Sequence, residues 1–141
     1  MMGFLKGLGL GVLVTGSGML LLAASPLDRG FDRIITHESG NQPQAVGDHG
    51  RSRGLAQISY PYYIDAKREM AKYGITPPPY RQAVKSRYWS KQLMHYYGLR
   101  YCPQAVASGN LDVFARIHNG GPSGCSKPQT VGYLRKVKRN K

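Results

Sequence analysis

The sequence contains few acidic residues, and this scarcity limits the chemistry that its side chains can perform. Only seven of the 141 residues are Asp or Glu, whereas 20 are Lys or Arg, which gives a formal net charge of +13. The positive excess favours polyanionic partners, namely nucleic acid, anionic lipid or the acidic polymers of a bacterial envelope, although it can also serve solubility alone. Carboxyl chemistry must draw on Asp28, Asp32, Glu38, Asp48, Asp65, Glu69 and Asp112.

Cysteine and metal-binding motifs are equally scarce. Cys102 and Cys125 are too few for a disulfide scaffold and lack the CxxC spacing of a zinc or redox site. The four histidines are scattered and form no HExxH motif. No GxSxG nucleophile elbow and no phosphate-binding loop occurs. We therefore expect neither a metal nor another cofactor.

The first 25 residues form an apolar segment that differs from the rest of the chain. No charged residue occurs from Gly7 to Leu27, and Lys6 precedes the run, as in a secretory signal peptide. The run is also long enough to span a bilayer as a helix. Leu22 lies at the minus-three position of a cleavage site after Ala24, which favours a retained anchor. Both interpretations place the remainder outside the cytoplasm, and a buried core helix is the structural alternative.

Residues 26–141 are predicted to form one mostly helical α+β domain. The length allows a single hydrophobic core, and no internal repeat is present. Residues 41–53 are rich in Gly, Asn, Asp and Ser, which indicates turns or a small β-hairpin. Helix-start residues, helix-stop residues and apolar spacing predict helices: from Ser25 to just before Gly40, from Pro61 towards Gly74, from Tyr80 to Tyr97 with Gly98 as its end, from Asn110 through Ile117, and from Ser126 into the basic tail at residues 135–139.

The most informative carboxyl group is that of Glu38, near the end of the first predicted helix of the domain. Burial of a carboxyl group raises its pKa and keeps it protonated near neutral pH, the state that a general acid needs to protonate a glycosidic oxygen. A second carboxylate then stabilises the oxocarbenium centre or activates water. Asp48, ten positions later in the turn-rich segment, is a candidate for this role. The alternative is that both are solvated surface residues.

Several ordered motifs resemble those of known glycosidases. ESG at residues 38–40, followed by GLAQI at residues 54–58, is similar to the ESG…GLxQI pattern of the lysozyme superfamily, which includes lytic transglycosylases. ISYPYYID at residues 58–65 resembles the QIxxPYWID run of invertebrate-type lysozymes. FARIHNGGPSGC at residues 114–125 resembles the FARxHNGGPxGC signature of that family, and TVGY at residues 130–133 resembles its TxGYW segment. These motifs cover most of the chain from about residue 33.

The resemblance implies a lysozyme-like fold and assigns roles to particular residues. Glu38 would be the general acid and Asp48 the second catalytic residue. The substrate-binding residues implied by the shared motifs are Gln57, Tyr62, His118 and Asn119. Three of these assignments have structural alternatives, because Tyr62 can be a core residue and the segment around His118 and Asn119 can form a left-handed turn.

The chain also departs from invertebrate-type lysozymes, which are rich in cysteine. Its two cysteines fall where the family has cysteines, so a disulfide between Cys102 and Cys125 is predicted. The segment around Asp48 is one residue shorter than the family pattern up to Gly54. The low cysteine content and the apolar N-terminus indicate a bacterial or phage-borne relative.

Three functions remain open at this stage. The first is a muramidase that hydrolyses the β-1,4 bond between N-acetylmuramic acid and N-acetylglucosamine in peptidoglycan strands. The second is a lytic transglycosylase, in which Glu38 acts alone and the 6-hydroxyl of the sugar forms a 1,6-anhydro end. The third is a non-enzymatic basic module that binds a membrane or DNA without specific nucleic-acid recognition. We expect an extracytoplasmic, secreted or membrane-anchored monomer.

Overall fold

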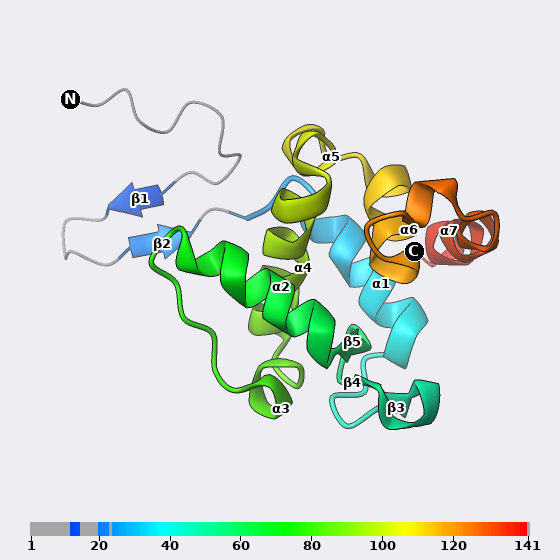
Figure 1. Ribbon diagram of the computed structural model, residues 1–141, viewed down its shortest axis with the longest axis horizontal. Helices are drawn as coiled ribbons and strands as arrows, with labels where there is room; N and C mark the ends of the chain where they lie inside the picture. The colour runs from blue at the N-terminus through cyan, green and yellow to red at the C-terminus, as the bar shows by residue number, and fades with distance from the viewer. Residues whose placement is uncertain (1–11, 15–19, 23, 141) are drawn as a thin grey trace.

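The computed structural model describes residues 12–14, 20–22 and 24–140, and within them the helices dominate (Figure 1). A small three-stranded sheet lies beside the helices, between the end of α1 and the start of α2. The predicted mostly helical α+β class is therefore confirmed. The α-helices are α1 Asp28–Ser39, α2 Tyr60–Ala71, α3 Tyr80–Ala83, α4 Arg87–Tyr101, α5 Pro103–Ser108, α6 Leu111–Gly120 and α7 Gln129–Arg139.

The predicted N-terminal helix is wrong for the part of the apolar segment that the structure describes. β1 Val12–Val14 pairs antiparallel with β2 Leu20–Leu22, and Val12 lies opposite Leu22. Valine is branched at Cβ, which restricts its χ1 rotamers and favours strands over helices. The glycines of this segment also disfavour a helix. The rest of the predicted signal peptide or anchor lies outside the described residues. No helix in the described part of the chain is long and apolar enough to cross a membrane.

The predicted turn-rich excursion is a small antiparallel sheet. β3 Val46–Gly47 pairs with β4 Ser52–Arg53, which pairs with β5 Ile58–Ser59. A short 3₁₀ helix, η1 Asp48–Gly50, connects β3 to β4. Gln57 supports the sheet from within, because its Nε2 donates hydrogen bonds to the backbone oxygens of Ala45 and Gly54.

The core forms where α1, α4 and α6 meet. Phe31 of α1 and Phe114 of α6 are fully buried and pack edge to face, with ring centroids 5.1 Å apart. Helix α4 passes behind α2 in Figure 1 and contacts α1, α2, α5 and α6. Gly98 lies inside α4, where a Cβ atom would come within 2.5 Å of Val106 Cγ2 and 3.1 Å of Phe114 Cε2. The missing side chain therefore allows α5 and α6 to approach α4.

The position of Gly98 corrects the predicted helix from Tyr80 to Tyr97. This segment is divided into α3 and α4, and α4 continues through Gly98 to Tyr101. A new helix begins after Ser86 because its Oγ accepts a hydrogen bond from the backbone N–H of Trp89. Close packing thus retains a glycine inside a helix despite its low helix propensity.

Other helix ends agree more closely with local sequence signals. Gly40 ends α1 with a φ of 60°, and Asn110 caps α6 by accepting a hydrogen bond from the backbone N–H of Val113. At the start of α1, Ser25 is not the N-cap, because Leu27 occupies that position and Ser25 Oγ accepts from its N–H. Together, these ends place Glu38 in the last turn of α1, at the edge of the sheet.

Candidate active site

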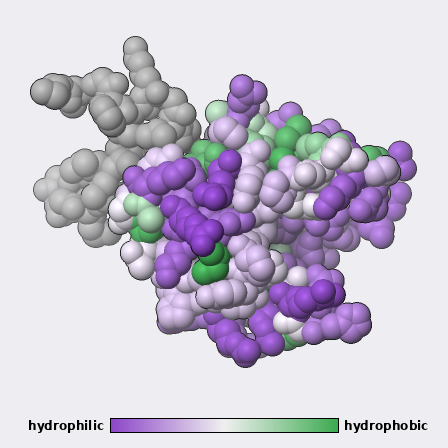
Figure 2. Space-filling model, in the orientation of Figure 1, coloured by the Kyte–Doolittle hydropathy of each residue, from purple (hydrophilic) through white to green (hydrophobic). Residues whose placement is uncertain are grey.

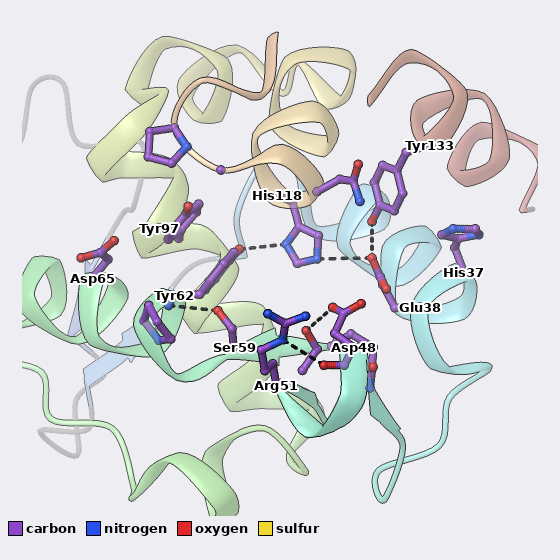
Figure 3. A pocket seen from close by; sticks show the side chains of 16 residues that line it. His37, Glu38, Asp48, Arg51, Ser59, Tyr62, Asp65, Tyr97, His118 and Tyr133 are labelled. Atoms are coloured by element: carbon purple, nitrogen blue, oxygen red, sulfur yellow. Dashed lines mark hydrogen bonds and ion pairs between the residues drawn. The ribbon is translucent and has the colours of Figure 1, made fainter. Parts of the chain in front are cut away.

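A cleft of about 630 Å³ opens between the sheet and the helices, and Glu38 lies on its wall (Figure 3). It brings together residues from α1, the sheet, α2, α4, α6 and α7. All six predicted catalytic and substrate-binding residues line this cleft, although His118 and Asn119 come from a part of the sequence distant from the other four. The lining residues are His37, Glu38, Asp48, Arg51, Ser52, Gln57, Ser59, Pro61, Tyr62, Asp65, Tyr97, His118, Asn119, Gly121, Pro122 and Tyr133.

Glu38 has the electrostatic character of a general acid. Its pKa is raised from 4.5 to about 7, chiefly because burial disfavours the charged carboxylate. A hydrogen bond from Tyr133 lowers the pKa, and the negative charge of Asp48 raises it. The Tyr133 hydroxyl donates to Glu38 Oε1 over 2.7 Å. The carboxyl group is therefore held in one position and is protonated in a large fraction of molecules at neutral pH.

A neutral histidine lies on the other side of Glu38. His118 is buried, which lowers its pKa to about 4, and its Nε2 donates a hydrogen bond to the backbone oxygen of Ala56 over 3.1 Å. Because the ring is neutral, Nδ1 accepts from the Tyr62 hydroxyl, 2.9 Å away. The His118 Nε2 to Glu38 Oε1 distance of 3.8 Å is too long for a hydrogen bond. His118 thus limits the space around Glu38 without adding positive charge.

Tyr62 links this wall of the cleft to the core. Its ring stacks on Tyr97 with centroids 3.6 Å apart and an interplanar angle of 7°. Only 8% of Tyr62 is exposed, so it serves both as a core residue and as part of the cleft wall. Helix α6 runs through His118 and Asn119 to Gly120, and the left-handed φ of 80° falls on Gly121. The positive φ expected in this segment thus follows the two residues, and their direct role in substrate binding stays a prediction.

Asp48 enters the same cleft from the turn between β3 and β4. Its φ is 51°, and the next two residues, His49 and Gly50, also have positive φ values, of 56° and 90°. Asp tolerates this left-handed backbone better than most residues, although such conformations cost on the order of 1–3 kcal/mol. Ser52 Oγ donates to Asp48 Oδ2 over 2.6 Å and fixes the side chain. Figure 3 shows the carboxyl groups of Asp48 and Glu38 projecting into the same hollow.

The cleft reduces the seven candidate acids to three. Asp65 is the third acid on the lining, but its Oδ2 accepts a hydrogen bond from the Tyr101 hydroxyl over 2.7 Å. The charge of Asp48 raises the pKa of Glu38, so these two carboxyl groups interact across the cleft. Asp48 is therefore the better candidate for the second carboxylate, and its catalytic role stays a prediction.

The two remaining predicted binding residues differ in their freedom to bind a ligand. The Gln57 amide uses its Nε2 within the sheet, and its backbone has a φ of 51°. It lies on the cleft wall chiefly as a structural residue. Asn119 is exposed on α6 and lines the cleft. A direct contact with a ligand stays a prediction for both residues.

Tyr133 is the functional residue that sequence reasoning did not identify. It comes from α7 and is hydrogen-bonded to Glu38, 95 positions earlier in the sequence. Its own pKa is raised by burial and by the charge of Glu38, so its hydroxyl is a permanent donor. The signal that could have found it is the TVGY motif at residues 130–133, because this tyrosine falls on the tyrosine of the TxGYW segment that the motif resembles. Ser52 was missed because its role depends on the fold of the turn.

The structure does not form the predicted disulfide between Cys102 and Cys125, which stays a prediction. Cys102 and Cys125 are both free thiols, Cys102 buried at the end of α4 and Cys125 exposed in η2 Gly124–Ser126. Cys125 Sγ lies 3.8 Å from the backbone oxygen of Val113 and is directed there instead. Burial raises the pKa of Cys102 to about 11, and the nearby Cys125 adds to this rise. In the described part of the chain, no group of His, Cys, Asp or Glu side chains could hold a metal ion.

Comparison with known proteins agrees with this geometry. Residues 29–140 match the Destabilase family. The chain is 34% identical to invertebrate-type lysozyme 3 of Caenorhabditis elegans, over 74% of this chain and 79% of that protein. It is 33% identical to lysozyme 1 of the oyster Crassostrea virginica over 74% of this chain, but it spans only about half the length of that relative (54%).

Solved structures extend the likeness from sequence to fold. The lysozyme of Meretrix lusoria in complex with PliI of Aeromonas hydrophila has a TM-score of 0.69 and 30% identity, covering 83% of this chain and 93% of that one. The Tapes japonica lysozyme has a TM-score of 0.66 and 27% identity, covering 79% and 87% of the two chains. The family match, the relatives and the shared fold therefore show that this chain belongs to the Destabilase family, together with the invertebrate-type lysozymes.

Proposed function

We propose that the protein is a muramidase, a glycoside hydrolase that cleaves the β-1,4 bond between N-acetylmuramic acid and N-acetylglucosamine in peptidoglycan. The observation that carries this proposal is the pair of carboxyl groups in one cleft, with the pKa of Glu38 raised to about 7. The names of the relatives support it, since they are lysozymes. A cleft of about 630 Å³ also suits several sugar rings of an extended strand.

In this reaction Glu38 donates a proton to the leaving glycosidic oxygen. Because the carboxyl group is buried, it keeps its proton near neutral pH, and Tyr133 holds one oxygen so that the other faces the cleft. The neutral His118 leaves this balance undisturbed, since it adds no positive charge that would lower the pKa of Glu38.

Asp48 supplies the second carboxyl group. Positive charge develops on the sugar ring as the glycosidic bond breaks, and a carboxylate in the cleft stabilises it or activates the attacking water. The hydrogen bond from Ser52 and the turn at the end of β3 hold Asp48 in place for this role. A lytic transglycosylase would not need this second carboxylate, and the lysozyme names of the relatives also favour hydrolysis.

The products of the reaction test this proposal directly. We expect the full chain to release fragments with reducing muramic ends from purified peptidoglycan, as measured by mass spectrometry. Fragments one water lighter, with 1,6-anhydro ends, would instead identify a transglycosylase. Release of no fragments at all would contradict both enzymatic functions and leave the basic binding module.

The pH dependence of hydrolysis should follow the proton of Glu38. The raised pKa means that the acid is protonated below about 7, so kcat/KM should fall as the pH rises through this value. The Tyr133 hydroxyl stabilises the carboxylate form of Glu38, so Tyr133→Phe should raise the pKa of Glu38. The fall of kcat/KM on the alkaline side of the pH profile, its alkaline limb, should then move to higher pH. A limb that stays in place or moves to lower pH would contradict the assignment. Tyr73→Phe, on an exposed tyrosine outside the cleft, is the matched control.

We also propose that the enzyme acts outside the cytoplasm as a monomer whose partner is the glycan strand. The net charge of +13 supports attraction to an anionic cell-wall polymer, and such attraction weakens as salt screens it. We also propose that residues 1–25 form a signal peptide or membrane anchor and that residues 26–141 form the lysozyme-like catalytic domain. The proposal includes neither a specific nucleic-acid partner nor a cofactor.

A further inference from the structure

A second groove continues from the cleft across the outer side of the sheet. It has a volume of about 390 Å³, and we call it the arginine groove. Arg51, Ser59 and Pro61 line both the cleft and this groove, so a ligand can extend from one into the other. Figure 2 shows that the surface at the bottom of the view, over α3 and β3, is mainly hydrophilic. The groove is lined by Gly50, Arg51, Arg53, Ser59, Tyr60, Pro61, Tyr80 and Arg81.

The three arginines of this groove form no ion pair with an acid in the part of the chain that the structure describes. None of the ion pairs within the described residues includes Arg51, Arg53 or Arg81, and the acids paired with Lys or Arg are Asp28, Asp32, Glu69 and Asp112. Arg51 Nε donates to the backbone oxygen of Asp48, which holds its side chain at the border with the cleft. The groove is lined by three guanidinium groups and by no acid. A smaller hollow of about 160 Å³ shares Arg53 and Arg81 and adds a fourth cation, Lys85.

Tyrosine rings form the apolar part of the same groove. Tyr60 is 56% exposed, although large aromatic residues are usually buried. It packs edge to face on Tyr80, with ring centroids 5.5 Å apart, and Tyr80 is fixed because its hydroxyl donates to the backbone oxygen of Ile58 over 2.6 Å. Arg53 and Arg81 line the groove together with Tyr80; burial raises the pKa of this tyrosine, and the two positive charges oppose that rise. The groove therefore combines cations with rigid aromatic surface.

We propose that the arginine groove binds the peptide stem of the muramic residue whose glycan strand lies in the cleft. This inference rests on the proposed muramidase function. The stem leaves the sugar ring sideways and carries free carboxylates, which the planar guanidinium group binds through two parallel hydrogen bonds. Its aliphatic side chains fit the exposed face of Tyr60. A hydrated phosphate chain would use the cations but not the aromatic surface, so the peptide fits both features of the groove.

The test compares Arg53→Gln/Arg81→Gln with the wild-type full chain on two substrates. The first is peptidoglycan freed of phosphate polymers, and the second is the same material after an amidase has removed its peptides. On the first, we expect the double variant to raise KM about five- to tenfold with kcat unchanged, since each partly exposed charge contact contributes little alone. On the second, it should equal the wild type. Lys67→Gln/Arg68→Gln removes the same charge from exposed positions on α2 and is the matched control.

Several outcomes would overturn the proposal. An unchanged KM on peptide-bearing material, an equal rise on both substrates, or the same rise in the control variant would each do so. A defect that occurs only when phosphate polymers are retained would identify phosphate as the ligand. Co-sedimentation with both materials measures binding without cleavage. If the wild type cleaves neither substrate, the muramidase proposal fails, and the difference in binding between the two materials still decides for or against the groove.

Discussion

Replacing Glu38 with glutamine is expected to lower the rate of peptidoglycan hydrolysis about 10²–10⁴-fold, the usual contribution of general acid catalysis. The amide has nearly the shape of the carboxyl group but no acidic proton to give to the glycosidic oxygen. The Tyr133 hydroxyl can still donate to the amide oxygen, as it does to Glu38 Oε1, so the site should keep its geometry. The change should therefore appear in kcat, measured by release of reducing ends.

The same variant should be more stable than the wild type at alkaline pH. The folded-state pKa of Glu38, about 7, lies above its ordinary value of 4.5, so the native protein holds this proton more tightly than the unfolded chain does. The associated stability is fully present below pH 4.5 and is lost as the pH rises through about 7. The loss is on the order of 3 kcal/mol. The free energy of unfolding, measured by chemical denaturation, should differ less between pH 4 and pH 8 for Glu38→Gln than for the wild type.

Asp112→Asn is the matched control for this experiment. It makes the same change from acid to amide, but Asp112 is exposed on α6 and paired with Lys138, away from the cleft. We expect full activity from this variant. If Glu38→Gln were as active as Asp112→Asn, Glu38 would not be the catalytic acid and the proposed mechanism would be wrong.

Replacing Asp48 with asparagine should lower kcat by about 10²-fold or more, because an amide neither stabilises the positive sugar ring as well nor activates water. Asparagine tolerates the left-handed φ of 51° at this position, so the turn should remain intact. Removing the negative charge should also lower the pKa of Glu38 and move the alkaline limb of the pH profile to lower pH. This shift is opposite to the one expected for Tyr133→Phe.

Ser52→Ala provides a graded comparison for Asp48→Asn. It keeps the carboxylate but removes the hydrogen bond that fixes it, so it should cost less activity than loss of the carboxylate itself. Circular dichroism verifies that both variants are folded. Near wild-type activity of a folded Asp48→Asn, with anhydro product ends, would show that Glu38 acts alone.

Local signals in the sequence were sufficient to predict much of the scaffold. Gly40 ends α1 because the backbone leaves the helix there in a left-handed conformation, which glycine adopts readily. This end places Glu38 in the last turn. Asn110 likewise caps α6 as expected. Both signals act within a few residues of the feature that they specify, which is why a single sequence reveals them.

Features that depend on tertiary packing were not accessible in the same way. Gly98 was predicted to end a helix, but it lies within α4 because Val106 and Phe114 occupy the space of a side chain. The contact from Tyr133 to Glu38 joins residues that only the folded chain brings together. The neutral state of His118 follows from its burial, which outweighs the opposite effect of the hydrogen bond to the Ala56 oxygen, and neither feature appears in a sequence motif.

The contact between α1 and α7 also bears on when the proposed acid gains its raised pKa during synthesis of the chain. Glu38 emerges from the ribosome long before Tyr133, and domains generally fold as units once their parts are available. Asn140 Nδ2 donates to the backbone oxygen of Arg33, so α7 closes over the helix that carries the acid. A nascent chain without α7 has its acid exposed to water, where the carboxyl group loses its proton at neutral pH. Copies that lack α7 should therefore lack the protonated Glu38 that the proposed mechanism requires.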